Sequence, residues 1–271
     1  MKVHPAVILL VLLAAAWFAL RRFESVSIYF PDRTEVFSPG TYGLRPSEVM
    51  LASSDGKKIS AWYFPPADEK PVLLFCHGNG GNISYCLDKI KALLGTGAGV
   101  FIFDYRGYGK SSGRPCEKGL YLDAEAALRW LASSAKISPG RIIIYGESLG
   151  CAVAVELAGR NPSCGGLVLE SPFTSMQEMG RKVYPFLPVR LIVTQKYDSI
   201  SKMPMLRCPL LVLHSREDEI IPFEMGRKIF EAAHVPKEFV TLRGGHNDGW
   251  AASGNTYLKA IKSFMGKVGR R

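Results

Sequence analysis

A serine lies at the centre of a glycine-bracketed turn, Gly146-Glu147-Ser148-Leu149-Gly150. A mostly apolar run over residues 141–145 precedes this turn, and a stretch typical of a helix, residues 151–158, follows it. A strand, a sharp turn and a helix in this order lift a serine hydroxyl to the edge of a sheet, where it can attack an electrophile. The glycines suit such a turn because it leaves no room for side chains two positions to either side. Ser148 is therefore the candidate nucleophile.

The same spacing of glycine and serine occurs a second time, at Gly109-Lys110-Ser111-Ser112-Gly113. This copy lies several residues beyond the apolar run 100–103, and Arg114-Pro115 follows it in place of a helix. We therefore interpret it as a glycine-rich loop without a nucleophile. Its Gly-Lys-Ser triplet also lacks the earlier glycine that a phosphate-binding P-loop requires.

A serine hydroxyl needs a base within hydrogen-bonding reach, and five histidines are available. His246 follows the apolar run 239–242 through Gly244-Gly245, a turn that would set its ring on the same sheet edge as Ser148. We expect His246 to be the base. The other four histidines have structural explanations. His4 precedes an apolar segment, and His77 and His214 are hydrogen-bonding residues that end apolar runs. His234 is expected to cap the helical stretch 223–233.

The acid that orients the base is expected between the serine and the histidine in the chain. There the apolar run 209–213 leads into the loop 215–222, which carries Glu217, Asp218 and Glu219. Asp218 is our choice because its short side chain lies in mid-loop, just before residues expected to pack inward. Glu217 and Glu219 remain alternatives as the acid. The loop could also be a solvent-exposed acidic turn with no catalytic role. Asp248 is expected to shape the loop of the histidine.

A tetrahedral oxyanion requires amide donors, and a second glycine-rich loop could supply one. His77-Gly78-Asn79-Gly80-Gly81-Asn82 follows the apolar run 72–76. Its backbone can approach a ligand closely, so the amides of Asn79 and Leu149 are the expected oxyanion donors. The alternatives for this loop are an ordinary turn or a phosphate cradle, but it lacks the Gly-Lys-Ser or Gly-Lys-Thr ending of such a cradle.

Short apolar runs must position these loops. They alternate with amphipathic helical stretches such as 120–133, and they lie at 72–76, 100–103, 141–145, 167–169, 209–213 and 239–242. This alternation predicts an α/β fold with a doubly wound, mostly parallel sheet and its ligand site at the carboxyl ends of the strands. Residues 49–51 and 58–64 predict an antiparallel hairpin at the sheet edge, joined through Asp55-Gly56.

The segment 173–205 interrupts this alternation with apolar residues set among basic ones. Its position predicts a small lid over the site. Apolar side chains there favour recognition of an acyl group, and ordinary packing is the alternative. With 47% hydrophobic residues in 271 and no linker, residues 23–271 are expected to form one domain.

The amino-terminal residues 6–20 are wholly apolar, with Lys2 before them and Arg21-Arg22 after them. Counted from residue 3, this segment would span about 27 Å as a helix, close to the thickness of a bilayer core. We expect residues 1–22 to be an uncleaved single-pass membrane anchor. A signal peptide cleaved after Ala14-Ala15-Ala16, leaving a secreted protein, is the alternative. The positive charges balance across the segment, so the side of the membrane is open.

The net charge of +10 and the pI near 9.3 would help a tethered domain to lie on anionic lipid. The basic residues are scattered and form no stripe with aromatic platforms, so nucleic acid is not an expected partner. The six cysteines show no disulfide framework by their spacing. Without a metal-spaced Cys or His cluster or a dinucleotide fingerprint, no metal and no cofactor is expected.

Taken in order, these motifs resemble those of the α/β-hydrolase superfamily. They are His77–Asn82, Asp104–Ser111, Gly146–Gly150, Glu170–Ser175, the Asp218 loop and Gly244–Asp248. More narrowly they resemble the membrane-anchored branch related to fungal bud-emergence proteins and to eukaryotic depalmitoylating hydrolases. The resemblance covers residues 47–265. It implies Ser148 as nucleophile, His246 as base, Asp218 as acid, and an oxyanion hole formed by Asn79 and Leu149.

The expected activity is that of a serine hydrolase that cleaves esters, thioesters or amides of a small-molecule or lipid-like acyl substrate through an acyl-enzyme. Two alternatives remain. An acyltransferase would use the same triad in a drier pocket, and a lipid- or protein-binding module could keep the fold without catalysis. The sequence leaves the physiological substrate and the oligomeric state open.

Overall fold

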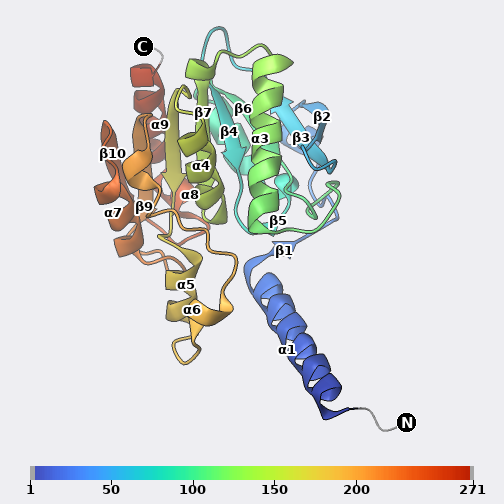
Figure 1. Cartoon of the computed structure of the whole chain (residues 1–271). Helices are drawn as coiled ribbons and strands as arrows, with labels where there is room; N and C mark the ends of the chain where they lie inside the picture. Colours follow the sequence, from blue (N-terminus) through green and yellow to red (C-terminus); the bar gives the residue numbers. More distant parts are fainter. Residues whose placement is uncertain (1–3, 269–271) are drawn as a thin grey trace.

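A computed structural model of the chain describes residues 4–268 and contains an eight-stranded sheet (Figure 1). The strand order is β10-β9-β8-β7-β4-β6-β3-β2. The strands are β2 Ser47–Ala52, β3 Lys58–Phe64, β4 Val72–Cys76, β6 Gly99–Phe103, β7 Ile142–Glu147, β8 Gly166–Glu170, β9 Leu210–Ser215 and β10 Lys237–Leu242.

Strand direction follows the sequence-based expectation. β2 pairs antiparallel with β3, and β3 pairs antiparallel with β6, which confirms the edge hairpin. All other neighbours in this sheet are parallel. The predicted doubly wound, mostly parallel sheet is therefore confirmed, and the loops after its parallel strands meet along one edge.

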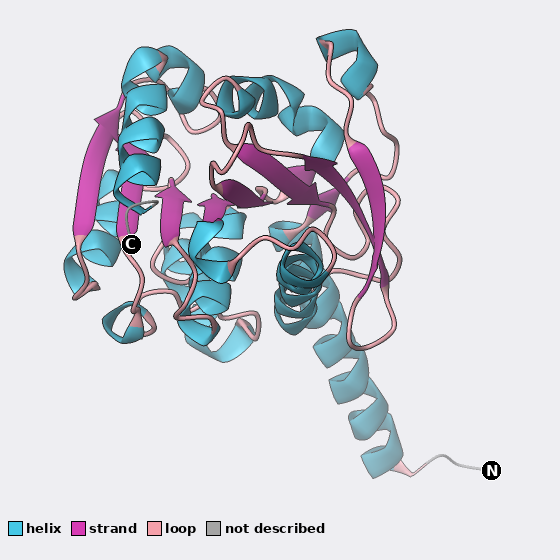
Figure 2. Ribbon diagram, turned by 90° about the horizontal axis from the view of Figure 1, so that it is seen from above, coloured by secondary structure: helices cyan, strands magenta, loops and turns pink. Residues whose placement is uncertain are grey.

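Helices cover both faces of the sheet because its central strands are apolar on both sides (Figure 2). In β4, residues Val72, Leu74 and Cys76 belong to the core on one face, whereas Leu73 and Phe75 belong to the core on the other. The first core includes side chains of α3 Glu117–Ser133, α4 Leu149–Arg160 and α7 Phe223–Ala232. The second includes side chains of α2 Leu87–Leu94 and α9 Asn255–Val268.

Short elements fill the connections. They are α8 Gly249–Ser253 and the 3₁₀ turns η1 Pro39–Tyr42, η2 Ile83–Cys86, η3 Pro139–Arg141 and η4 Met203–Met205. The expectation that His234 caps α7 is wrong. Lys237 Nζ takes that place by donating hydrogen bonds to the carbonyls of Phe230 and Ala233, both at 2.7 Å.

The amino-terminal helix α1 runs over Pro5–Ile28 and is long and apolar enough to cross a membrane. An 18-residue window of it has a mean hydropathy of 2.0, and none of that window is buried against the domain. The helix continues past Arg22, so its last turns lie against the domain, where Glu24 and Ile28 are buried. Residues 1–3 of the predicted anchor lie outside the described residues.

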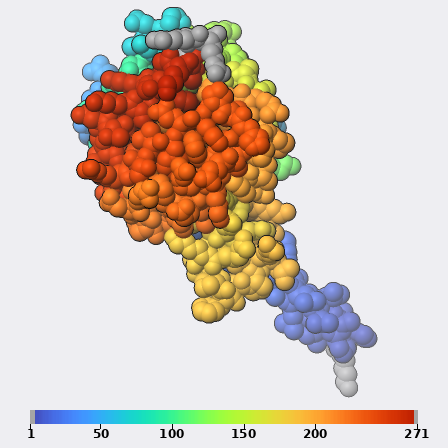
Figure 3. All heavy atoms as spheres, turned by 90° about the vertical axis from the view of Figure 1, so that its left-hand side faces the viewer, coloured from blue at the N-terminus to red at the C-terminus, as the bar shows by residue number. Residues whose placement is uncertain are grey.

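Two short strands that are far apart in the sequence pair just after the end of α1. β1 Phe30–Pro31 pairs in parallel with β5 Gly80–Gly81, which lies within the predicted oxyanion loop. The segment 173–205 forms α5 Met176–Val183, α6 Val189–Ile192 and the coil around them. It projects from the same side of the domain as α1 (Figures 1 and 3).

Candidate active site

Ser148 occupies a sharp turn between β7 and α4, with backbone angles φ 53° and ψ −118°. A positive φ with this ψ is strained for a residue with a side chain. Close packing explains the flanking glycines. A Cβ on Gly146 would lie 2.6 Å from Cys151 Cα, and one on Gly150 would lie 2.0 Å from the carbonyl oxygen of Cys76. The turn therefore requires glycine at both positions, as the sequence predicted.

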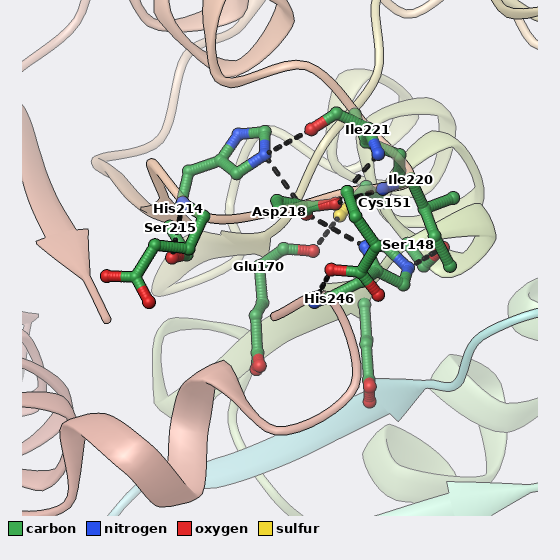
Figure 4. A network of polar contacts seen from close by, with 12 residues as sticks. Ser148, Cys151, Glu170, His214, Ser215, Asp218, Ile220, Ile221 and His246 are labelled. Carbon is green, nitrogen blue, oxygen red and sulfur yellow. Dashed lines mark hydrogen bonds and ion pairs between the residues drawn. The ribbon is translucent and has the colours of Figure 1, made fainter. Parts of the chain in front are cut away.

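His246 lies between Ser148 and Asp218 (Figure 4). Its Nδ1 is 2.8 Å from Asp218 Oδ2, and its Nε2 is 3.0 Å from Ser148 Oγ. A carboxylate can only accept, so in the neutral ring Nδ1 carries the proton and Nε2 accepts from the serine hydroxyl. The structure thus brings together the three side chains that the sequence singled out, from the loops after β7, β9 and β10.

Asp218 is held by several donors at once. Its Oδ1 accepts hydrogen bonds from the amides of Ile220 at 3.0 Å and Ile221 at 2.7 Å. His214 Nε2 lies 3.2 Å from Oδ2. Burial alone would raise the pKa of Asp218, but the hydrogen bonds from His214, His246 and Ile221 outweigh it and hold the pKa well below its usual range. The carboxylate is therefore ionised beside His246 at neutral pH.

The two alternative acids occupy other positions. Glu219 Oε2 accepts the backbone amide of His246 at 3.0 Å, and Glu217 Oε2 accepts that of Gly244 at 3.2 Å. Both carboxylates therefore brace the loop that carries the histidine, while Asp218 alone of the three contacts its ring. Asp248 directly precedes α8, and its carbonyl accepts the amide of Ala252 at 2.8 Å.

The two predicted oxyanion donors lie beside the serine. Leu149 is the first residue of α4, so its amide has no partner within the helix and points along the positive end of the helix dipole. Asn79 lies in the loop after β4, and Gly78 next to it would bring a Cβ to 3.7 Å from Ser148 Cβ. The carbonyl oxygen of Asn79 accepts from Phe30 N and Tyr108 Oη, at 3.0 and 2.8 Å, which holds the Asn79–Gly80 peptide, next to the one that carries the Asn79 amide, in place.

Two cavities meet at Ser148 and His246. One, of about 470 Å³, is mostly apolar and lies among the loop of Ile220, the segment 173–205 and the last turns of α1. The other, of about 620 Å³, is polar and lies on the side of Asp32, Lys89 and Glu147. A carbonyl carbon placed at the serine could therefore have an apolar group on one side and a polar group on the other.

A buried charge cluster beneath the serine turn was missed by the sequence analysis. Lys89 lies 2.9 Å from Glu147 and 3.0 Å from Glu170. Burial alone would lower the pKa of Lys89, but the two carboxylates outweigh it and raise the pKa, so the ammonium stays charged. Glu170 also accepts from Tyr145 Oη, and its backbone carbonyl accepts Ser148 N at 2.9 Å. Glu147 and Glu170 lay within the recognised motifs, but nothing in the sequence marked Lys89 as their partner.

His77 directly follows β4 with its ring buried, and its Nδ1 lies 2.8 Å from the carbonyl of Gly78. Burial lowers the pKa of His77 to about 4, so the ring is neutral at neutral pH. His77 and His214 thus hold the loops of Asn79 and Asp218 in place, which agrees with their expected structural role.

Known proteins match both the sequence and the fold of this chain. A family model described as alpha/beta hydrolase fold matches residues 71–199. An Alpha/beta hydrolase domain-containing protein WAV2 of Arabidopsis thaliana is 31% identical over 90% of this chain and 88% of its own length. The human Alpha/beta hydrolase domain-containing protein 17B is 35% identical over 80% and 74%, respectively.

Solved structures agree on the fold. The esterase Pf2001 of Pyrococcus furiosus has a TM-score of 0.74 at 22% identity and covers 88% of this chain and 98% of its own. An alpha-beta hydrolase of Vibrio vulnificus has a TM-score of 0.73 at 21% identity over 97% and 95%. The sequence relatives match over most of both chains at more than 30% identity, and the chain therefore belongs to the α/β-hydrolase superfamily.

Proposed function

We propose that this protein is a membrane-anchored serine hydrolase that cleaves carboxylic esters or thioesters. The observation that carries the proposal is the hydrogen-bonded line from Ser148 through His246 to Asp218, with spacings of 3.0 and 2.8 Å. These residue types in this order are those of a nucleophile, a general base and an orienting acid. The family membership and the strained serine turn support the same reading.

In the proposed reaction Ser148 Oγ attacks the acyl carbon while His246 Nε2 takes the hydroxyl proton. The resulting oxyanion receives hydrogen bonds from the amides of Asn79 and Leu149. The bond to the alcohol or thiol then breaks, and the leaving group takes the proton from His246. Water repeats these steps on the acyl-enzyme, releases the carboxylic acid and restores the serine.

The two cavities support an assignment of the two halves of the substrate. The apolar cavity suits the acyl group, because Phe173, Met176 and Met179 line it together with Ile221. The polar cavity suits the alcohol or thiol part, because Asp32, Lys89 and Glu147 line it. In this proposal the segment 173–205 is the lid of the acyl side, and α1 anchors the domain in the membrane.

Covalent labelling by a fluorophosphonate tests the nucleophile. We expect the full-length protein in detergent to be labelled and Ser148→Ala to lose the label while keeping its far-ultraviolet circular dichroism. Ser111→Ala, in the second glycine-serine turn, is the matched control and should label like the wild type. Undiminished labelling of Ser148→Ala would overturn the assignment. Retention in the membrane pellet after alkaline carbonate extraction tests the anchor, and release into the supernatant would contradict it.

A further inference from the structure

The anchor helix forms one wall of the apolar cavity. Phe23, Glu24, Ser27 and Ile28 of α1 line it, opposite the segment 173–205. The ring of Phe23 lies 5.6 Å from that of Tyr184, centroid to centroid. A cavity that touches Ser148 at one end is therefore completed by the helix that is long enough to cross a bilayer.

A buried carboxylate joins these two walls. Glu24 is 5% exposed, and its Oε1 accepts the amides of Thr194 at 2.6 Å and Gln195 at 2.8 Å. Its Oε2 accepts from Thr194 Oγ1 and from Arg21, both at 2.7 Å. Three of these four donors belong to the coil that follows α6, so the carboxylate fixes the end of α1 to that coil.

The end of α1 is also bonded to the predicted oxyanion loop. Asn79 Nδ2 donates to the carbonyl of Ile28 at 3.0 Å, and Phe30 N donates to the carbonyl of Asn79 at the same distance. These contacts set the position of α1 relative to the residues around Ser148. A helix that served only to retain the domain in the membrane would not need them.

Exposure along the lining shows where the cavity opens. Next to Ser148 the lining residues Leu149, Phe173 and Ile221 are each at most 3% exposed. Other apolar lining residues are 37% to 56% exposed, namely Phe23, Phe30, Val183, Tyr184, Leu187 and Ile220. The mouth therefore lies between the end of α1, the segment 173–205 and the loop of Ile220.

Apolar side chains continue from this mouth along the outside of the molecule. Phe186 is 97% exposed and Leu191 is 85% exposed, and both belong to the segment 173–205, which projects on the same side as α1 (Figure 3). Arg22, Arg181 and Arg190 are exposed in these same two segments. Exposed aromatic and aliphatic residues accompanied by arginines, beside an apolar helix, are typical of a surface that lies at the interface of a bilayer.

From these contacts we infer that the acyl chain of the substrate reaches Ser148 directly from the bilayer, through the mouth between α1 and the segment 173–205. The inference rests on the proposed hydrolase activity and extends it to a substrate class, long-chain acyl esters or thioesters that reside in the membrane. Glu24 is then a positioning residue that holds the two walls of the entry together, and Ser27 faces the passage.

The test uses the full-length protein in phospholipid nanodiscs with two esters, p-nitrophenyl butyrate and p-nitrophenyl palmitate. Ser27→Phe places a ring in the passage without touching the Glu24 contacts. It should lower kcat/KM for the palmitate roughly tenfold or more while butyrate hydrolysis stays within about twofold. Ser25→Phe makes the same substitution at a position of the same helix that does not line the cavity, and it should leave both rates unchanged. Glu24→Ala should act like Ser27→Phe, with Glu48→Ala on the distant β2 as its control.

The outcomes separate the two proposals. A wild type that hydrolyses neither ester would contradict the hydrolase assignment itself. If the wild type hydrolyses both esters and Ser27→Phe lowers both rates equally or lowers neither, only the proposed route of entry is overturned.

A second measurement is independent of hydrolysis. A tryptophan in the segment 173–205, Phe186→Trp, should add fluorescence that is quenched by lipids with a nitroxide on the acyl chain. Met50→Trp, at a residue that is 56% exposed on β2, should add fluorescence that they leave intact. Equal quenching of the two added tryptophans would overturn the placement of the mouth at the bilayer.

Discussion

Two turns of this protein share the spacing Gly-x-Ser-x-Gly but differ in backbone, burial and partners. In the first, Ser148 is partly exposed at φ 53°, with its hydroxyl 3.0 Å from His246. In the second, Ser111 is fully buried, donates to the carbonyl of Asp104 at 2.7 Å and accepts the amide of Ser60 at 2.9 Å. One hydroxyl is held at the junction of two cavities, while the other satisfies the backbone of a loop.

The glycines of the two turns also serve different contacts. Gly150 allows α4 to pass against the backbone of Cys76, which places the helix amides next to the serine. Gly109 has φ 44°, and a Cβ there would lie 2.1 Å from Asp104 Oδ2. A five-residue motif therefore becomes a site only where a strand before it and a helix after it carry the serine to a sheet edge.

The largest expected effect concerns the acid behind the first turn. Asp218→Asn keeps the shape of the side chain but favours the wrong tautomer of His246, so kcat for an ester should fall about 10³- to 10⁴-fold. Asp248→Asn, on the same loop as the histidine, is the control and should keep most of the activity. Steady-state kinetics with p-nitrophenyl butyrate measures both variants. A fall of less than about tenfold in Asp218→Asn would remove Asp218 from the proposed triad.

Close packing of the first turn gives the next largest effect. In Gly150→Ala the added carbon would lie 2.0 Å from the carbonyl oxygen of Cys76, so the helix or the strand must move. We expect a loss of about 3 kcal/mol or more in the free energy of unfolding. Gly159→Ala, in the same helix with nothing within 4 Å of the added carbon, should be neutral or slightly stabilising. Denaturant unfolding distinguishes them, and equal stability of both variants would refute the packing argument.

A smaller effect is expected for the serine of the second turn. Ser111→Ala leaves a buried carbonyl and a buried amide without their partner, so it should cost about 1 to 3 kcal/mol of stability. Hydrolysis by the folded fraction should be unchanged, since the hydroxyl is buried within its loop. Loss of activity in protein that remains fully folded would mean that the two turns are not as different as their contacts indicate.

The carboxyl group of Asp104, beside the second turn, should make the stability of the protein depend on pH. Burial raises the pKa of Asp104 to about 7, although the amide of Ile83 opposes this, whereas the pKa of Asp218 is lowered. Between about pH 4 and pH 7 the folded state keeps the proton on Asp104 and the unfolded state has lost it. Stability therefore falls as pH rises through this range, by at most about 1.4 kcal/mol per pH unit.

Asp104→Asn should flatten this part of the stability profile while keeping an acceptor for the amide of Ile83. Denaturant unfolding at several pH values between 4 and 8 measures the slope for both proteins. An identical slope in the variant would assign the pH dependence to other groups.

Much of the site could be predicted because its residues lie in recognisable local sequence patterns. Ser148 lies between an apolar run and a helical stretch, and His246 follows the last apolar run through two glycines. Strand direction and the edge hairpin followed from the same apolar runs, since strands buried on both faces must be apolar throughout. The choice among Glu217, Asp218 and Glu219 rested on chain length and position, because sequence does not fix the direction of a side chain in a loop.

Other features had no local signal at all. Lys89 occupies a helix, where a lysine ordinarily reaches solvent, and only the packing of α2 on the sheet brings it between two carboxylates. Glu24 comes shortly after the double arginine that ends the apolar segment, and no pattern around it predicted a role. Its contacts with Thr194 and Gln195 join residues about 170 positions apart.

The succession of strands and helices along the chain, the sharp serine turn and an apolar amino-terminal helix could be predicted from the amino-acid sequence, because these depend on residues close together in the chain. The folded structure was needed to show which carboxylate contacts His246, where the two cavities lie, and that the end of α1 forms a wall of one of them. Those features depend on side chains from distant loops that pack at one sheet edge, and the local sequence does not determine such long-range contacts.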